Sequence, residues 1–506
     1  MFKGQPKGLL AAAFANMGER FGFYTMMAIL VLFLQAKFGL DGQNAGIIYG
    51  AFYFSIYILA LIGGIIADRI QNYKGTILTG LILMALGYVI LAFPTPTPVS
   101  SIPLYLSITV VGLFVIAFGN GLFKGNLQAL VGQMYDNKEY GKLRDSGFSL
   151  FYMFINIGAI FAPFTAVGIR NWWLGKNQLS YDADLPAMCH SFLNDSISEK
   201  AQTSFQAMAD KASGIPVSDL TTFSNNYLNV FNTGFHYAFG IAIIAMIISL
   251  LVFVKNKKNF PNPRKTTKVG EITDEIKMEA NEIKQRMYAL LAVFGIVIFF
   301  WFSFHQNGLS LTFFARDYTL LKFGSWSFSA EIFQSMNPFF VVFLTPIVVG
   351  LFGWLRGRNM EPSTPKKIAI GMGIASLGFV VMVLGSFGLP LFETINPQSG
   401  GMPLDEASRV TPFLLLGTYF ILTVAELFIS PMGISFVSKV APPQYQGMMQ
   451  GGWLGATALG NGLLFIGAVL YEQIPIWMTW GIFVIATAIS MFTMLFMIKW
   501  LERVAK

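Results

Sequence analysis

The chain has 506 residues, of which 54% are hydrophobic and 12% are charged. Soluble domains contain about 25% charged residues, so this composition excludes a soluble enzyme and indicates a polytopic membrane protein. The formal net charge is +8, which we attribute to loops on one side of the membrane rather than to nucleic-acid binding. The single cysteine excludes an internal disulfide, and no Cys/His spacing indicates zinc or an iron–sulfur cluster, so we expect no metal site.

Twelve apolar stretches of the sequence are each long enough to cross a hydrocarbon core about 30 Å thick. They are continuous rather than alternating with a period of two, which excludes a β-barrel. The sequence therefore predicts an all-α membrane protein with 12 transmembrane helices. We place the spans near residues 9–34, 45–67, 75–94, 104–131, 147–168, 233–254, 287–314, 331–355, 367–388, 411–437, 447–471 and 476–499.

The distribution of Lys and Arg predicts the orientation of the chain. The segments on the side of the N-terminus hold 24 of these residues and the opposite segments hold 8. Because positive charge is enriched in cytoplasmic loops, both termini are expected in the cytoplasm.

The predicted units are an N-terminal bundle of spans 1–5 (1–168), an outer insertion (169–232), span 6 (233–254), a cytoplasmic linker with an amphipathic helix (255–286) and a C-terminal bundle (287–506). We read the insertion as a tolerated loop, with a small folded cap as the alternative.

Ionisable side chains inside the spans are the first candidates for a functional site. Each costs at least about 2.5 kcal/mol on insertion scales, so it is a functional hypothesis by default. Span 1 contains Glu19 and Arg20, span 4 contains Lys124, span 7 contains His305 and span 10 contains Glu426.

Polar residues accompany these charges at helical spacing. In span 1, Asn16, Arg20, Tyr24 and Met27 share one helix face. Glu19 is adjacent to Arg20, so we expect these two side chains to find different partners. A structural ion pair between helices is the alternative to a functional role for them.

Spans 4 and 5 repeat this pattern. Asn120, Lys124 and Gln128 share a face of span 4, and Tyr152 and Asn156 share a face of span 5.

The charges in the spans match a zwitterionic ligand. Lys124 and Arg20 would bind a carboxylate, and Glu426 would bind an ammonium group by charge-assisted hydrogen bonds. Pro431, which follows Ser430, removes a backbone hydrogen bond and predicts a kink in span 10.

At these residues the chain resembles the proton-coupled oligopeptide transporter (POT) family of the major facilitator superfamily. Residues 16–24 (NMGERFGFY) resemble the span-1 motif ExxERFxYY, and 148–159 (FSLFYMFINIGA) resemble FYxxINxGS. Residues 63–69, which include Asp68 and Arg69, resemble the family's gating motif in loop 2–3. Further matches are WFSFHQ (301–306), QSMNP (334–338), ELFISPMG (426–433) and MQGGW (449–453).

The resemblance implies a secondary transporter that imports di- and tripeptides with protons by alternating access, with the proton as coupling ion and no other cofactor. Its substrate site would be lined by Arg20, Tyr24, Tyr57, Lys124, Asn156, Asn337, Glu426, Ser430 and Trp453. Lys124 and Arg20 would hold the peptide carboxylate, Glu426 its ammonium, and Asn156 and Asn337 its backbone. We expect the protein to lie in the lipid bilayer of the cell inner membrane and to be a monomer.

Three residues depart from the family motifs, and the first and third of them concern proton coupling. Asn16 replaces the first Glu of the span-1 motif, Phe23 replaces its first Tyr, and His305 replaces the Glu of span 7. The implied coupling residues are then Glu19, Arg20, His305 and Glu426. A neutral His305 is able to accept a hydrogen bond from Lys124, whereas a protonated one repels it. The two extra helices of many bacterial members have no counterpart in 255–286.

Two other functions stay open at this point. The second choice is a carrier of the same fold for another small polar or zwitterionic solute, with or without proton coupling. A membrane-embedded enzyme is disfavoured because the spans contain no HExxH, no Ser/His/Asp grouping and no phosphate-binding Gly-rich loop.

Overall fold

The computed structural model describes residues 4–70, 72–135, 139–140, 143–261, 280–324, 326–442 and 445–504. In these ranges, twelve helices or helical runs are long and apolar enough to cross a membrane, which confirms the predicted number of spans. The predicted linker helix falls largely on residues 262–279, which lie outside the described ranges.

The N-terminal half places six long helices in the membrane. Two shorter helices, α6 (Leu185–Leu193) and α7 (Glu199–Ser213), separate the fifth from the sixth, and a short helix η2 (Lys257–Asn259) follows the last. The long helices are α1 (Lys7–Phe38), α2 (Gly42–Ile70), α3 (Tyr73–Ala92), α4 (Ile102–Met134), α5 (Arg144–Lys176) and α8 (Leu220–Lys255).

The C-terminal half has six further spans, and some of them are broken. The helices are α9 (Ala280–Phe304), η3 (His305–Gly308), α10 (Ser310–Asp317), η4 (Ala330–Ser335), α11 (Met336–Gly357), α12 (Thr364–Gly385), α13 (Phe392–Ile395), η5 (Pro397–Ser399), η6 (Glu406–Ser408), α14 (Pro412–Val440), α15 (Gln446–Gly462), α16 (Leu464–Gln473) and α17 (Ile476–Val504). The strands β1 (Lys322–Phe323) and β2 (Trp326–Ser327) pair antiparallel.

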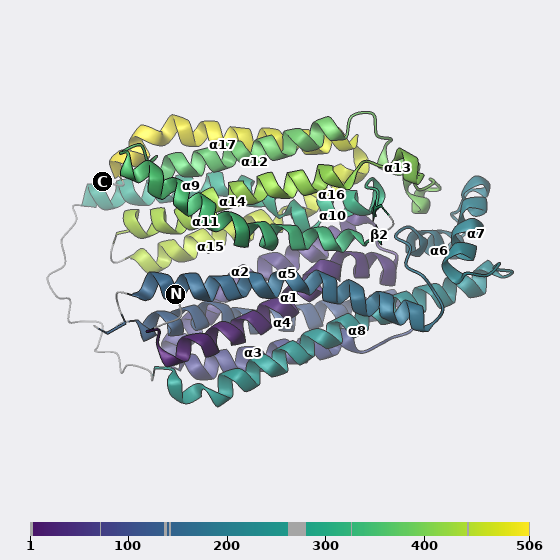
Figure 1. Ribbon diagram of the computed structural model, residues 1–506, viewed down its shortest axis with the longest axis horizontal. Coiled ribbons are helices and arrows are strands. Elements are labelled where there is room, and N and C mark those ends of the chain that lie inside the picture. Colours follow the sequence, from purple (N-terminus) through teal and green to yellow (C-terminus); the bar gives the residue numbers. More distant parts are fainter. Residues whose placement is uncertain are drawn as a thin grey trace.

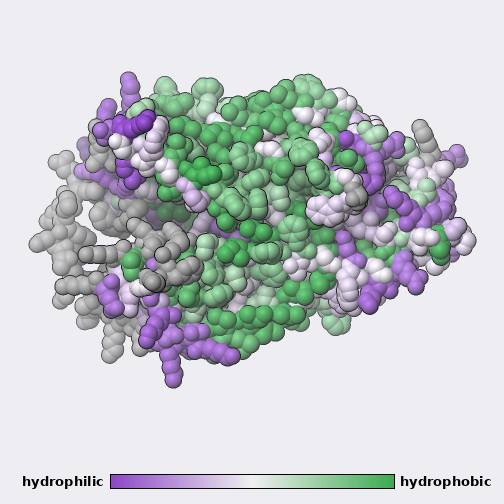
Figure 2. Space-filling view, in the orientation of Figure 1, coloured by the Kyte–Doolittle hydropathy of each residue, from purple (hydrophilic) through white to green (hydrophobic). Residues whose placement is uncertain are grey.

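The two halves form two bundles that lie side by side, as Figure 1 shows. The N- and C-termini lie at one end of the molecule, and α6 and α7 lie at the opposite end, which we call the α6–α7 end. On the face that Figure 2 shows, apolar side chains cover the long helices between two more hydrophilic ends. An apolar band of this kind is expected where lipid surrounds the protein.

Glycines allow some helices of the N-terminal bundle to approach each other closely. A Cβ atom added to Gly80 of α3 would lie 2.6 Å from the carbonyl oxygen of Gly119 in α4. One added to Gly121 of α4 would lie 2.5 Å from the carbonyl oxygen of Leu59 in α2. These approaches explain part of the high glycine content, since membrane helices pack through small residues.

The seventh and eleventh spans differ from the continuous helices that their hydropathy predicts. The seventh changes from α9 to the 3₁₀ segment η3 at His305 and resumes as α10 at Ser310. The eleventh is interrupted at Leu463, between α15 and α16. Hydropathy does not detect these breaks, because it reports the environment of side chains and not the path of the backbone. A 3₁₀ stretch inside a helix often marks a functional site.

The insertion between α5 and α8 is folded and shorter than predicted. Because α5 continues to Lys176 and α8 begins at Leu220, the segment between them is 177–219 rather than 169–232. Ser198 and Asp219 cap the first turns of α7 and α8 through their side chains, as N-cap residues do. Cys189 of α6 is buried.

Candidate functional site

A central cavity lies between the two bundles. Its walls come from α1, α2, α4 and α5 of one half and from α9, η3, η4, α11 and α14 of the other. It encloses about 1360 Å³ of empty space, its opening included. This is room enough for a small organic ligand. The predicted site residues that line it are Arg20, Tyr24, Tyr57, Lys124, Asn156, His305, Asn337, Glu426 and Ser430.

The helix faces read from the sequence turn towards this cavity. Asn16, Tyr24 and Met27 line it from α1, and Gln128 and Tyr152 line it from α4 and α5. The cavity is therefore the place where the polar faces of several apolar helices meet.

The prediction that Glu19 and Arg20 pair with different partners is wrong. Arg20 donates from Nε to Glu19 Oε2 at 2.5 Å and from Nη2 to Oε1 at 2.7 Å, so the two neighbours form a bidentate pair. Their long side chains curl towards each other although their Cα atoms are adjacent. Asn120 of α4 donates to the same carboxylate at 2.7 Å. Since Glu19 is fully buried, most of the charge of Arg20 is already balanced inside the protein.

Lys124 is the cavity cation that stays available to a ligand. Its Nζ lies 4.6 Å from the centre of the Tyr57 ring, a cation–π contact. Among the residues that the structure describes, none forms an ion pair or hydrogen bond with it. An ammonium group in a partly dry cavity without a counterion attracts a carboxylate strongly.

Glu426 faces the cavity from the opposite bundle. Its Oε2 accepts a hydrogen bond from Asn337 Nδ2 at 2.8 Å, and this amide also donates to Thr423 Oγ1 at 3.1 Å. No cation pairs with Glu426 in the described part of the chain. One turn on, Ser430 presents a hydroxyl that is buried and has no hydrogen-bond partner among the described residues. The carboxylate is thus oriented by Asn337 and free to bind an ammonium group.

His305 begins the break in the seventh span. Its Nδ1 lies 2.5 Å from Asn461 Oδ1 of α15, and its ring stacks on Trp301 at 4.9 Å. The Tyr53 ring of the other bundle also lies 4.9 Å away. The hydrogen bond with Lys124 that the sequence left possible is not among the contacts that the structure describes.

Trp453 and the loop motif are not part of the cavity wall. Trp453 is 4% exposed, packs against Phe294 and covers Gly433, where a Cβ atom would collide with its ring. In this conformation the indole fills the space between α9, α14 and α15, and its predicted contact with substrate stays a prediction. Arg69 is exposed near the end of α2, and the side chain of Asp68 lies outside the described part of the structure.

Several cavity residues were not predicted from the sequence. Tyr49 and Tyr53 precede Tyr57 at intervals of four residues, and all three line the cavity from α2. That spacing is a helix face and was a usable signal. Asn461, the partner of His305, gave no such signal, because only the fold brings residues so far apart in sequence together.

The fold and the cavity define a transporter with the major facilitator fold, in which two six-helix bundles enclose a central site. Residues 74–276 and 264–481 match the model of the POT family (PTR2). The chain belongs to the POT family.

Curated relatives match nearly the whole chain. An uncharacterized transporter of Bacillus subtilis, YclF, is 28% identical over 95% of this chain and 91% of its own length. The peptide transporter YePEPT of Yersinia enterocolitica is 27% identical over 91% and 87%. Dipeptide and tripeptide permease B of Xenorhabdus bovienii is 25% identical over 99% and 97%.

Solved structures share the fold at lower identity. A crystal structure of a peptide transporter POT in complex with sulfate has a TM-score of 0.74 and 24% identity, and the match covers 100% of this chain and 96% of that one. A POT family transporter in complex with 5-aminolevulinic acid has a TM-score of 0.72 at 19% identity, with 100% and 98% covered.

Proposed function

We propose that this protein imports di- and tripeptides together with protons. The observation that carries the proposal is the pair of uncompensated charges on opposite walls of one cavity, the ammonium of Lys124 and the carboxylate of Glu426. A short peptide presents the complementary charges at its two ends. The names of the relatives from Yersinia and Xenorhabdus support this substrate class. The proton is the coupling ion, and no other cofactor is required.

The contacts between the bundles support alternating access. Hydrogen bonds between the halves gather at the α6–α7 end: Gln334 donates to Ala28 O, Glu472 accepts from Gly42 N, and Arg316 donates to Gln35. Closure at this end leaves the cavity to be reached from the end that carries the termini. A rocking movement that breaks these contacts would expose it on the other side.

We place the protein in the cell inner membrane, with both termini in the cytoplasm. The two termini lie at one end of the bundles (Figure 1), and Lys and Arg are concentrated in the loops of that end, as the positive-inside rule requires. The α6–α7 end then faces outwards, and the described conformation faces inwards. One chain encloses the whole cavity, which supports a monomer as the transport unit.

Uptake of labelled dialanine into proteoliposomes tests the proposal. We expect uptake to rise when an inward proton gradient is imposed and to fall when unlabelled tripeptide competes. Uptake that is insensitive to the gradient would contradict coupling. Absence of uptake, with transport of a zwitterion that is not a peptide, would favour the alternative carrier.

The role of His305 gives a separate prediction. Asn16 cannot titrate, whereas the imidazole of a histidine is able to take up and release a proton. In His305→Gln we expect peptide exchange without a gradient to persist and peptide-driven proton movement to be lost. His236→Gln, which removes a buried imidazole of α8 outside the cavity, is the control. Undiminished proton movement in His305→Gln would move the coupling role to Glu19 or Glu426.

A further inference from the structure

The folded segment 177–219, which we call the insertion, belongs to the N-terminal half but is fastened to the C-terminal half. Arg409, in the loop before α14, donates from Nη2 to Asp184 Oδ2 at 2.5 Å. The Ser191 hydroxyl donates to the carbonyl oxygen of Pro397. Ser204 of α7 contacts the Met402 sulfur at 3.2 Å. The insertion therefore bridges the two bundles at the end where the cavity is closed.

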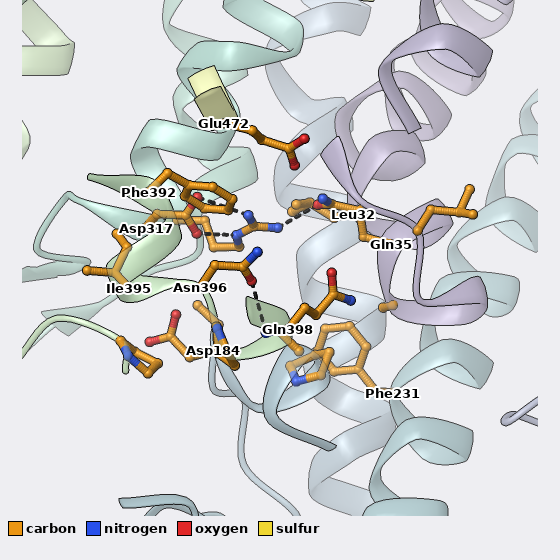
Figure 3. Close-up of a pocket in the computed structure, with 18 of the residues that line it drawn as sticks. Leu32, Gln35, Asp184, Phe231, Asp317, Phe392, Ile395, Asn396, Gln398 and Glu472 are labelled. Atoms are coloured by element: carbon orange, nitrogen blue, oxygen red, sulfur yellow. Dashed lines mark hydrogen bonds and ion pairs between the residues drawn. The ribbon is translucent and has the colours of Figure 1, made fainter. Parts of the chain in front are cut away.

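The start of the insertion also contacts the C-terminal half, through Arg170 of α5. Arg170, near the end of α5, forms a fully buried ion pair with Glu331 of η4 and donates to the Ser329 hydroxyl at 2.9 Å. The guanidinium also lies 4.1 Å from the centre of the Tyr181 ring, inside the insertion. Figure 3 shows Asp184, Asp317 and Glu472 around one pocket at this end. The closed end is thus a charged interface and not only an apolar contact.

We propose that the insertion is a latch on the outer gate and that Asp184 and Arg409 are its gating pair. When the halves separate at this end as rigid bodies, the pair breaks, since its two members belong to different halves. Arg409 also donates to the carbonyl oxygens of Leu404 at 3.1 Å and Arg316 at 2.8 Å, both in its own half. The guanidinium keeps these partners after the pair breaks, so the latch is able to open and re-form.

The environment of Asp184 gives the latch a pH dependence. Burial raises the pKa of the Asp184 carboxyl to about 6 from 3.8, although Arg409 opposes the shift, and the charges of Asp182 and Asp317 add to it. Other charged groups line the pockets that Asp184 shares with the neighbouring elements: Arg170, Lys211, Arg316, Lys322, Asp405, Glu406 and Glu472.

The sign follows from comparing the closed form with an open form in which water surrounds the carboxyl. Between the ordinary pKa and about 6, the closed form binds one proton more than the open form. Acid therefore stabilises closure. Above about pH 6 the closed form must bury a charged carboxylate and loses that stabilisation. A proton that arrives from outside would favour closing of the outer gate, which is the direction that inward transport requires.

The distance between the bundles at the α6–α7 end measures the latch directly. Spin labels are attached after Lys176→Cys and Phe387→Cys, two exposed positions on opposite halves, in a Cys189→Ser background. From about pH 5 to about pH 7.5 we expect the ratio of closed to open molecules to fall about tenfold. In Asp184→Asn we expect a ratio that no longer changes with pH.

Variants of Arg409 separate the gating pair from a general disturbance. Arg409→Ala leaves the Asp184 carboxylate buried without its cation. At about pH 7.5 the ratio of open to closed molecules should therefore be about tenfold higher than in the wild type. Adding Asp184→Asn should remove most of that effect, because a neutral amide needs no cation. Lys322→Ala breaks a pair with Glu406 at the same end but within one half, and should leave the distances unchanged.

The latch is overturned if Arg409→Ala leaves the distances unchanged at both pH values, or if Asp184→Asn keeps the full pH response. The inference rests on alternating access, but these distances are measured without substrate. The distance measurements can therefore contradict the latch while dialanine uptake is observed, or support the latch while no uptake is observed.

Discussion

Replacing Lys124 by alanine is expected to abolish the uptake of dipeptides. Lys124 is the cavity cation without a carboxylate partner in the described structure, whereas Arg20 is already paired with Glu19. A hydrogen bond to a charged group contributes about 1.5–3 kcal/mol, so affinity should fall roughly 10- to 150-fold. Uptake of labelled dialanine and its competition by dialanine amide measure the effect, since the amide lacks the carboxylate that Lys124 would bind.

The conservative variant Lys124→Arg keeps the charge and should retain part of the uptake. In the wild-type protein, dialanine amide should compete poorly with the free acid. If the acid and the amide compete equally well, the carboxylate is not recognised by Lys124. Gln128→Ala, which changes another cavity residue one turn further along α4, controls for a general disturbance of this wall.

A second large effect is expected for Glu426→Gln. The wild-type carboxylate should select a free α-ammonium group, so N-acetylated dipeptides should bind at least about tenfold more weakly, or about 1.4 kcal/mol. The variant keeps the shape and the hydrogen bond from Asn337 but loses the charge, and it should lose most of this preference. Competition of free and acetylated dialanine against labelled dialanine gives the ratio for each protein.

Glu361→Gln is the matched control for this experiment. Glu361 is a carboxylate of the same half that pairs with Arg356 and Lys367 outside the cavity, so its loss should leave the preference intact. If Glu426→Gln still distinguishes free from acetylated peptide as the wild type does, another group recognises the ammonium.

The membrane spans were predictable because their cause is local. A stretch of apolar residues crosses the bilayer whatever its neighbours do, so length and hydropathy gave the correct number of spans. The ends of α5 and α8 were not predictable in this way. Both helices continue past the apolar core as polar helix, through residues that hydropathy had assigned to the insertion. Hydropathy carries no signal there, and the helix ends depend on the residues that cap them.

The site was predictable where one helix face carried it. Arg20 and Tyr24 of α1 and Lys124 of α4 line the cavity as their spacing indicated. Contacts that depend on the packing of distant segments were not predictable, such as the pair of His305 with Asn461. The same limit applies to Trp453, whose motif says nothing of which side of α15 its indole occupies in this conformation.

The buried position of Cys189 has a practical consequence. It is the single cysteine of the chain and lies in α6, inside the latch. Burial raises the pKa of the Cys189 thiol, and the thiolate is the form that reacts with alkylating reagents. The unmodified protein therefore carries its own chemical reporter. The rate at which a membrane-impermeant maleimide labels it follows the fraction of molecules in which α6 has separated from its neighbours.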